Sequence, residues 1–231
     1  MTEVATSRVN SPAIRTVLFD LDGTLADTAP DLALALNTLL KETGKPPLPY
    51  ERIRQEASYG GTALVRLGFD LSPEDNDFAA LRQRFLDLYQ SRICVDTRLF
   101  DGMESVLNDL ASANMNWGIV TNKPAYLTDP LVKLLGLADK AAAVVSGDTT
   151  NNSKPHPEPL LHACELAGSR PEQCLYVGDA RRDIEAGQRA GMKTLVATFG
   201  YLRDDDNTDE WGADGAIASP TELIEWIRRH G

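Results

Sequence analysis

The sequence predicts an α/β protein in which a parallel sheet is covered by helices on both faces. Short apolar runs that suit buried strands alternate with amphipathic stretches that suit helices over most of the chain. Polar side chains follow directly after several of these apolar runs. At 231 residues the chain is long for one domain and short for two. These observations favour one core with a smaller insert.

The first segment of the chain mixes Thr, Ser, Asn and Pro and lacks the apolar core of a signal peptide, so we expect residues 1–14 to be a flexible tail. Residues 16–19 form the first predicted strand. Pro30 and Gly44 enclose the first predicted helix, because Pro favours the first turn and Gly the position after the last. The apolar face of this helix consists of Leu32, Leu36, Leu39 and Leu40.

Three further helical signals follow before the next strand. The Pro-rich residues 45–49 form a stiff link, after which we expect a helix near residues 50–57. Residues 59–62 open another short helix. The longest signal runs from residue 73 to about 92, and its stripe of Phe78, Leu81, Phe85 and Leu88 favours a packed core over a ligand pocket.

The pattern returns to alternating helix and strand from residue 99 onward. Strands are expected at residues 117–120, 144–145, 175–177 and 194–197, with helices before and after the first of these. Ser219 to Glu222 form a capping box with Pro220 at the first helical position, which predicts the start of a terminal helix.

Composition limits the partners and the compartment. The 23 basic and 34 acidic residues give a net charge of −11, which argues against nucleic acid or an anionic membrane as a partner. No segment approaches the length of a membrane span. The three cysteines (Cys94, Cys164 and Cys174) are widely spaced and odd in number, which favours thiols in a reducing cytosol. We therefore expect a cytoplasmic monomer or homodimer that acts on a small molecule.

Two carboxylates, Asp20 and Asp22, stand one residue apart at the end of the first predicted strand. Carboxylates this close repel each other unless a cation or a shared proton lies between them. The pair is therefore a candidate metal and nucleophile site. The alternative is an acidic turn, because Asp and the following Gly23 are ordinary turn residues.

Further polar residues follow other predicted strands or precede helices: Thr121, Asn122, Lys154, Asp179 and Asp183. In an open parallel sheet these strand ends converge on one crevice. Acids, a hydroxyl and an ammonium are the groups needed to hold Mg²⁺ and a phosphate. Each group also has a structural alternative, since Thr121 and Asn122 suit a helix cap, Lys154 a solvated surface and Asp183 the first turn of a helix.

The motifs Asp-Leu-Asp-Gly-Thr, Val-Thr-Asn, Lys-Pro and Gly-Asp-x-x-x-Asp occur here in that order. In this order they resemble the four motifs of the haloacid dehalogenase-like phosphohydrolases over about residues 15–228. The sequence is most similar to the phosphoglycolate phosphatase-like branch, and residues 199–214 resemble the tail of the N-acetylmuramic acid 6-phosphate phosphatases. This resemblance implies a Rossmann-like core of residues 15–29 and 96–231, with a helical cap at residues 30–95 inserted after the first strand.

The resemblance implies Mg²⁺-dependent hydrolysis of a phosphate monoester through an aspartyl-phosphate. Asp20 would be the nucleophile, and Asp22 would protonate the leaving group and then take a proton from water. Mg²⁺ would lie on Asp20, Asp179 and the backbone carbonyl of Asp22, with Asp183 as a direct or water-mediated ligand. The remaining predicted contacts with the phosphoryl group come from Lys154, which neutralises charge, and from Thr121, Asn122 and amides near Gly23.

The leaving group is less well defined by the sequence. Gly60 and Gly61 could offer amides to an anion or simply form a helix-entry turn. Arg66 could pair with a substrate carboxylate or be a solvated helix residue. Both 2-phosphoglycolate and N-acetylmuramic acid 6-phosphate carry such a carboxylate, so Arg66 does not separate them.

Other classes of protein share parts of this pattern. A sugar-phosphate phosphatase or a phosphomutase of the same fold remains open. A haloacid dehalogenase also uses an aspartate nucleophile but needs no metal and no acid at the position of Asp22. The non-enzyme alternative is a phosphoacceptor receiver domain, whose pattern does not require the long interval between Asp22 and Thr121.

Overall fold

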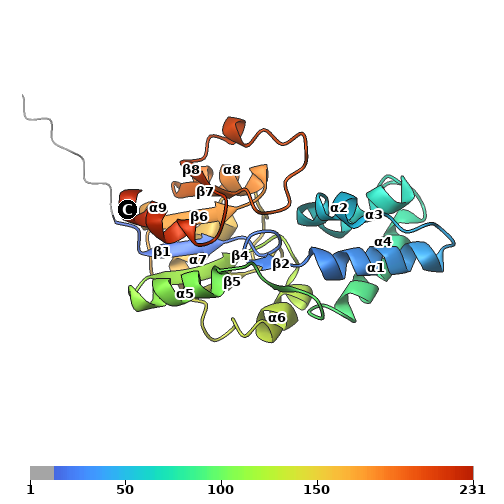
Figure 1. Cartoon of the computed structure of the whole chain (residues 1–231), viewed down its shortest axis with the longest axis horizontal. Helices are drawn as coiled ribbons and strands as arrows, with labels where there is room; N and C mark the ends of the chain where they lie inside the picture. Colours follow the sequence, from blue (N-terminus) through green and yellow to red (C-terminus); the bar gives the residue numbers. More distant parts are fainter. Residues whose placement is uncertain (1–12, 231) are drawn as a thin grey trace, which may run out of the picture.

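The computed structural model describes residues 13–230. Its main sheet has six parallel strands in the order β5-β4-β1-β6-β7-β8 (Figure 1). The bounds of these strands are β1 Thr16–Phe19, β4 Asn116–Val120, β5 Ala143–Val145, β6 Cys174–Gly178, β7 Lys193–Ala197 and β8 Gly215–Ile217. In this register Phe19 of β1 lies between Ile119 of β4 and Val177 of β6. The predicted parallel α/β sheet is confirmed, and Asp20 directly follows its central strand β1.

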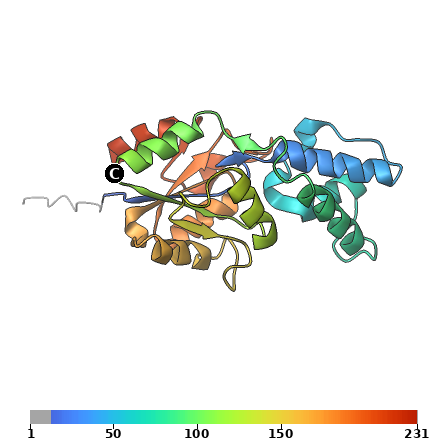
Figure 2. The ribbon, with the colours of Figure 1, turned by 90° about the horizontal axis from the view of Figure 1, so that it is seen from below.

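Alternate residues of β1 pack against different helices. Val17 and Phe19 belong to the core that includes α5 (Met103–Ser112) and α9 (Glu222–His230). Leu18 faces the other way and packs with α7 (Glu158–Leu166) and α8 (Arg181–Ala190) (Figure 2). Helices therefore cover both faces, as expected for strands made of continuous apolar residues. Helix α6 (Ala125–Leu134) follows β4.

A group of helices lies beside the sheet, next to the C-terminal ends of its strands (Figures 1 and 2). It consists of α1 (Ala29–Glu42), α2 (Tyr50–Arg54), the 3₁₀ turn η1 (Ala57–Tyr59), α3 (Gly60–Phe69) and α4 (Phe78–Gln90). We call this group the helical insert. The chain enters it through β2 (Ala26–Asp27) and leaves it through β3 (Arg98–Leu99), and these two short strands pair antiparallel.

Asp31 fixes the junction between the insert and the sheet. Its buried carboxylate accepts hydrogen bonds from the backbone N–H groups of Val95, Asp96 and Thr97 and from the Thr97 hydroxyl. The first turn of α1 is thereby tied to the segment that returns to the core. The boundaries predicted for a separate cap, residues 30–95, fall within this junction and stay a prediction.

Several elements differ from the predicted ones. The helix expected from residue 73 begins at Phe78, because a turn precedes it in which Asp75 accepts a hydrogen bond from the Ser72 N–H. The helix expected to reach residue 57 ends at Arg54. Strands β2, β3 and β8 were not predicted, since two or three residues carry no readable alternation. The tail predicted for residues 1–14 lies largely outside the described residues, and Ile14 is buried in the core.

Candidate active site

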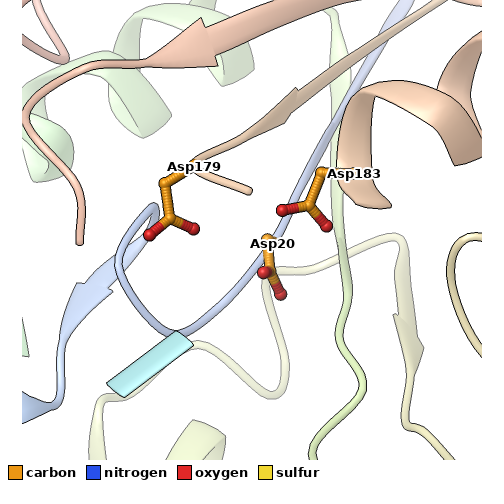
Figure 3. A group of neighbouring side chains, drawn as sticks. All are labelled: Asp20, Asp179 and Asp183. Carbon is orange, nitrogen blue, oxygen red and sulfur yellow. The ribbon is translucent and has the colours of Figure 1, made fainter. Parts of the chain in front are cut away.

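Three carboxylates meet at the C-terminal ends of β1 and β6. Asp20 follows β1, Asp179 follows β6, and Asp183 lies in the first turn of α8. One oxygen from each lies within 4.8 Å of the others, and all three residues are buried (Figure 3). Carboxylate oxygens are the ligands that hard divalent cations such as Mg²⁺ prefer. The donor set therefore fits such an ion.

These acids share a region from which water is largely excluded. Burial raises the pKa of Asp20 above its usual range, although the Lys154 ammonium opposes this effect. Burial, together with the charges of Asp20 and Asp183, raises the pKa of Asp179 to about 7. The Arg182 guanidinium also lowers the pKa of Asp20, so two cations, Lys154 and Arg182, act on these acids. A divalent cation bound here would add positive charge that favours the ionised form of all three acids.

Lys154 is buried and its ammonium group contacts two of the three acids. Its Nζ is 2.9 Å from Asp20 Oδ1 and 2.8 Å from Asp183 Oδ1. It also donates to the Val120 carbonyl and to the Tyr176 hydroxyl at 2.8 and 2.7 Å. The protein thus fixes this ammonium group between the predicted nucleophile and the helix acid.

Asn122 and Thr121 occupy the loop after β4, where the sequence predicted phosphate ligands. The side chain of Asn122 is engaged with the backbone of Lys154, with its Nδ2 donating to the carbonyl at 2.9 Å and its Oδ1 accepting from the N–H at 3.0 Å. Asn122 therefore holds the Lys154 loop in place. Thr121 Oγ1 accepts a hydrogen bond from the N–H of Lys123 at 3.1 Å, an arrangement that still allows its hydroxyl proton to face a ligand.

Asp22 points to a different set of partners from Asp20. Its Oδ1 is 2.8 Å from Lys123 Nζ and accepts a hydrogen bond from Thr28 Oγ1 at 2.6 Å. Burial alone would lower the pKa of Lys123, but the charges of Asp22 and Tyr89 and the hydrogen bonds to both together outweigh it, and the pKa rises. The Lys123 ammonium also lies 4.8 Å from the centre of the Tyr89 ring. The two tandem acids thus have separate lysine partners.

The sequence left Lys123 outside the candidate set. A signal was present, because Lys123 directly follows Thr121-Asn122 at the end of a predicted strand. Its pairing with Asp22 depends on the register of β1 and β4, which the sequence alone does not state.

Gly23 allows the loop after β1 to approach Asp179. Its φ is +86°, and a Cβ at this position would lie 2.1 Å from Asp179 Oδ2. Its N–H already donates to the carbonyl of Ala26 at 3.1 Å. The N–H of Gly23 is therefore engaged within the loop and close packing explains the glycine, while the predicted contact between the phosphate and amides near Gly23 stays a prediction.

A cavity of about 360 Å³ opens above Asp20 and lies between the sheet and the insert. Its walls include six of the predicted site residues: Asp20, Asp22, Gly60, Gly61, Thr121 and Asn122. Arg66 is not among them, because it lines a separate hollow beside Arg203 on the outer side of α3. Two arginines that the sequence did not single out, Arg82 and Arg182, line the cavity.

The 3₁₀ turn of the insert touches the carboxylate group directly. Ser58 Oγ donates to Asp179 Oδ2 at 2.6 Å, and the Ser58 carbonyl accepts from Arg182 at 2.6 Å. The Tyr59 ring lies between two guanidinium groups, at 5.2 Å from Arg182 and 3.8 Å from Arg203. The insert therefore closes over the site. Sequence reasoning missed Ser58, since a lone serine in a polar segment gives no distinctive signal.

Residues 17–197 match the family model described as haloacid dehalogenase-like hydrolase. The chain belongs to the haloacid dehalogenase-like hydrolases. Among curated relatives, the N-acetylmuramic acid 6-phosphate phosphatase of Pseudomonas putida is 43% identical over 214 residues, which cover 93% of this chain and 96% of that protein. The phosphoglycolate phosphatase of Xanthomonas campestris is 41% identical over 214 residues, which cover 91% of this chain and 95% of that protein.

Solved structures agree with this membership. A crystal structure of a predicted phosphoglycolate phosphatase from Haemophilus somnus superposes with a TM-score of 0.81 at 26% identity, covering 92% of this chain and 97% of that one. The resemblance drawn from the four sequence motifs is confirmed, and this haloacid dehalogenase-like hydrolase is a phosphatase. In the described part of the chain, none of the helices has the length and apolar character needed to cross a membrane.

Proposed function

We propose that this phosphatase hydrolyses a small phosphate monoester with the help of Mg²⁺ and through an aspartyl-phosphate on Asp20. The observation that carries the proposal is the buried group of Asp20, Asp179 and Asp183, with Lys154 beside it and a cavity above it. Splitting the displacement into two steps makes each one easier, which matters because phosphate monoesters hydrolyse very slowly without a catalyst.

Asp20 and Asp179 would hold the cation, with Asp183 as a direct or water-mediated ligand. When bound, Mg²⁺ supplies positive charge that screens the phosphoryl dianion and keeps the acids ionised. Asp20 Oδ1 accepts a hydrogen bond from the Leu21 N–H at 2.7 Å and lies 2.9 Å from Lys154 Nζ. We therefore assign the attack on phosphorus to Asp20 Oδ2. Lys154 stabilises the charge that passes between the carboxylate and the phosphoryl oxygens.

Asp22 is placed for the proton transfers. Lys123 and Thr28 hold its Oδ1, and the residue lines the same cavity as Asp20. In the first step Asp22 gives a proton to the departing alkoxide oxygen. In the second step it takes a proton from the water that attacks the phosphorus of the aspartyl-phosphate, which restores both acids.

The insert supplies the wall that faces the leaving group, and we propose that residues 30–95 act as a cap. Gly60, Gly61 and the cavity face of α4 lie opposite Asp20 across the cavity. Closing a cap excludes water and positions the substrate. The printed names of the relatives suggest two substrates for this chain, 2-phosphoglycolate and N-acetylmuramic acid 6-phosphate. Each is a phosphate monoester of a hydroxy acid.

Trapping the acyl phosphate tests the proposal. The protein is mixed with Mg²⁺ and p-nitrophenyl phosphate, quenched, and treated with borohydride, which reduces an aspartyl-phosphate to homoserine. Peptide mass spectrometry should find the reduction at Asp20 in the wild type and at no position in Asp20→Asn. Phosphate release with the label on another residue, or in the presence of excess EDTA, would contradict the assignment.

A further inference from the structure

Helix α4 presents one face to the cavity. Arg82, Phe85, Leu86 and Tyr89 all line it, and their spacing of three, four and seven positions places them on one side of a helix. Phe85, Leu86 and Tyr89 are buried, whereas Arg82 is exposed. Of the stripe that the sequence predicted as packed core, Phe85 alone lines the cavity, and with Leu86 and Tyr89 it forms an apolar wall that ends in the cation Arg82.

The two ends of this helix face lie at different distances from the acids that would act on the phosphoryl group. Tyr89 is at the reacting end, because its ring lies 4.8 Å from the ammonium of Lys123, which pairs with Asp22. Arg82 is seven residues earlier, which corresponds to about 10 Å along the helix axis at a rise of about 1.5 Å per residue. Arg82 thus stands at the end of the cavity remote from the phosphoryl site.

Arg82 also differs from the other cations of the cavity in that it has no acidic partner among the described residues. Lys123 pairs with Asp22 at 2.8 Å, and Arg182 lies near the charges of Asp183, Asp20 and Asp179 and donates to the carbonyl of Ser58. Among residues 13–230, Arg82 forms no ion pair, and its hydrogen bond runs from Nε to Thr62 Oγ1 at 3.2 Å. That bond orients the guanidinium and leaves both terminal nitrogens for an incoming anion.

We propose that Arg82 determines specificity by binding a carboxylate of the leaving group at the end of the cavity remote from the phosphoryl site. The inference rests on the proposed hydrolysis of a phosphate monoester. A guanidinium suits this role because its terminal nitrogens match the two oxygens of a carboxylate. The sequence suggested Arg66 as the residue that pairs with a substrate carboxylate, but Arg66 lines a different hollow. We assign this role to Arg82 instead.

The spacing selects between the two candidate substrates. An extended chain advances roughly 1.2 Å per bond, so the three bonds between phosphorus and carboxyl carbon in 2-phosphoglycolate span about 4 Å. In N-acetylmuramic acid 6-phosphate about eight bonds separate these atoms, which corresponds to about 10 Å. The separation of about 10 Å along α4 between Tyr89 and Arg82 therefore favours the longer phosphorylated sugar acid, with its ring against Phe85 and Leu86, over 2-phosphoglycolate.

The test compares two sugar phosphates that differ in the carboxylate. N-acetylmuramic acid 6-phosphate carries it on a lactyl ether, and N-acetylglucosamine 6-phosphate has a hydroxyl at that position. The measured quantity is the ratio of kcat/KM for the first substrate to kcat/KM for the second, in the wild type, Arg82→Gln and Arg84→Gln. Arg84 is the matched control, because it lies on the same helix and pairs with Glu42 on the surface.

We expect Arg82→Gln to lower this ratio by about 10- to 100-fold, chiefly through KM, since a hydrogen-bonded pair with a charged group contributes roughly 1.5–3 kcal/mol. Arg84→Gln should keep the wild-type ratio. An unchanged ratio in Arg82→Gln, an equal loss on both substrates, or a wild-type ratio near one would overturn the inference. Turnover of p-nitrophenyl phosphate separates these outcomes from failure of the proposed function, which would abolish hydrolysis of every monoester.

Discussion

Acidification is expected to weaken Mg²⁺ binding, because Asp179 becomes protonated near neutral pH. Its pKa is raised to about 7 by burial and by the charges of Asp20 and Asp183. Below that pH the folded, metal-free protein holds a proton on Asp179, and a cation must displace this proton in order to bind. The affinity should therefore fall by a factor that approaches ten per pH unit well below 7, or about 15-fold between pH 7 and 5.5, because the site is already half protonated at pH 7.

The raised pKa of Asp179 also determines how the stability of the metal-free protein changes with pH. The pKa of Asp179 in the folded protein lies above its unfolded value of 3.8, so protonation favours the folded state. This contribution is fully present below pH about 4 and is lost as the pH rises through about 7. From 3.8 to 7, at 1.36 kcal/mol per unit, the loss amounts to about 4 kcal/mol. Bound Mg²⁺ should restore stability at neutral pH.

Isothermal titration calorimetry checks both the affinity and the displaced proton. Mg²⁺ is titrated at pH 5.5, 6.5, 7.5 and 8.5 in pairs of buffers with different ionisation enthalpies. We expect about one proton released per ion at pH 5.5 and almost none at pH 8.5. Thermal unfolding in EDTA over the same range gives the stability profile. A constant affinity from pH 5.5 to 8.5 would refute the argument that Asp179 is protonated in the metal-free site.

Three substitutions test other parts of the site. Asp20→Asn should lower turnover by at least about 1,000-fold and leave the unfolding temperature in EDTA unchanged or higher, because one of three repelling acids becomes neutral; wild-type phosphate release would remove Asp20 from its role. Gly23→Ala would place a Cβ 2.1 Å from Asp179 Oδ2 at a φ of +86°, so Mg²⁺ binding measured by calorimetry should be lost, and wild-type affinity would show that the loop can move aside. Lys123→Met removes the ammonium group that lies 2.8 Å from Asp22. The free energy of unfolding measured in urea should fall by about 3 kcal/mol, and kcat should fall more than KM rises. Unchanged values in both assays would contradict a buried ion pair.

The sequence predicted the parts of the site that follow single strands. Asp20, Thr121 and Asp179 each come directly after a short apolar run, and a parallel sheet brings such positions to one edge. Local patterning therefore sufficed to place them together. The order of the strands was not predicted, because alternation alone does not tell which strands are neighbours.

The site residues that the helical insert contributes were not predictable in the same way, because they depend on how the insert packs against the sheet. Arg66 lies in α3 and Arg82 in α4. Which way each side chain points depends on how its helix is rotated about its axis when it packs against its neighbours. In hindsight the stripe that contains Phe85 extends one turn back to Arg82, whereas Arg66 lies beside the buried Leu64 and Val65. Ser58 reaches Asp179 only because the insert folds back over β6, which no periodicity expresses.

The antiparallel pairing of β2 with β3 has a consequence for how this protein can diversify. Paired strands hold the start and the end of the intervening 70 or so residues within about 5 Å of each other. Such a segment can be lengthened, shortened or replaced without moving the strand that precedes Asp20. Selection for a new leaving group can therefore act on one part of the gene while the phosphoryl-transfer machinery stays intact.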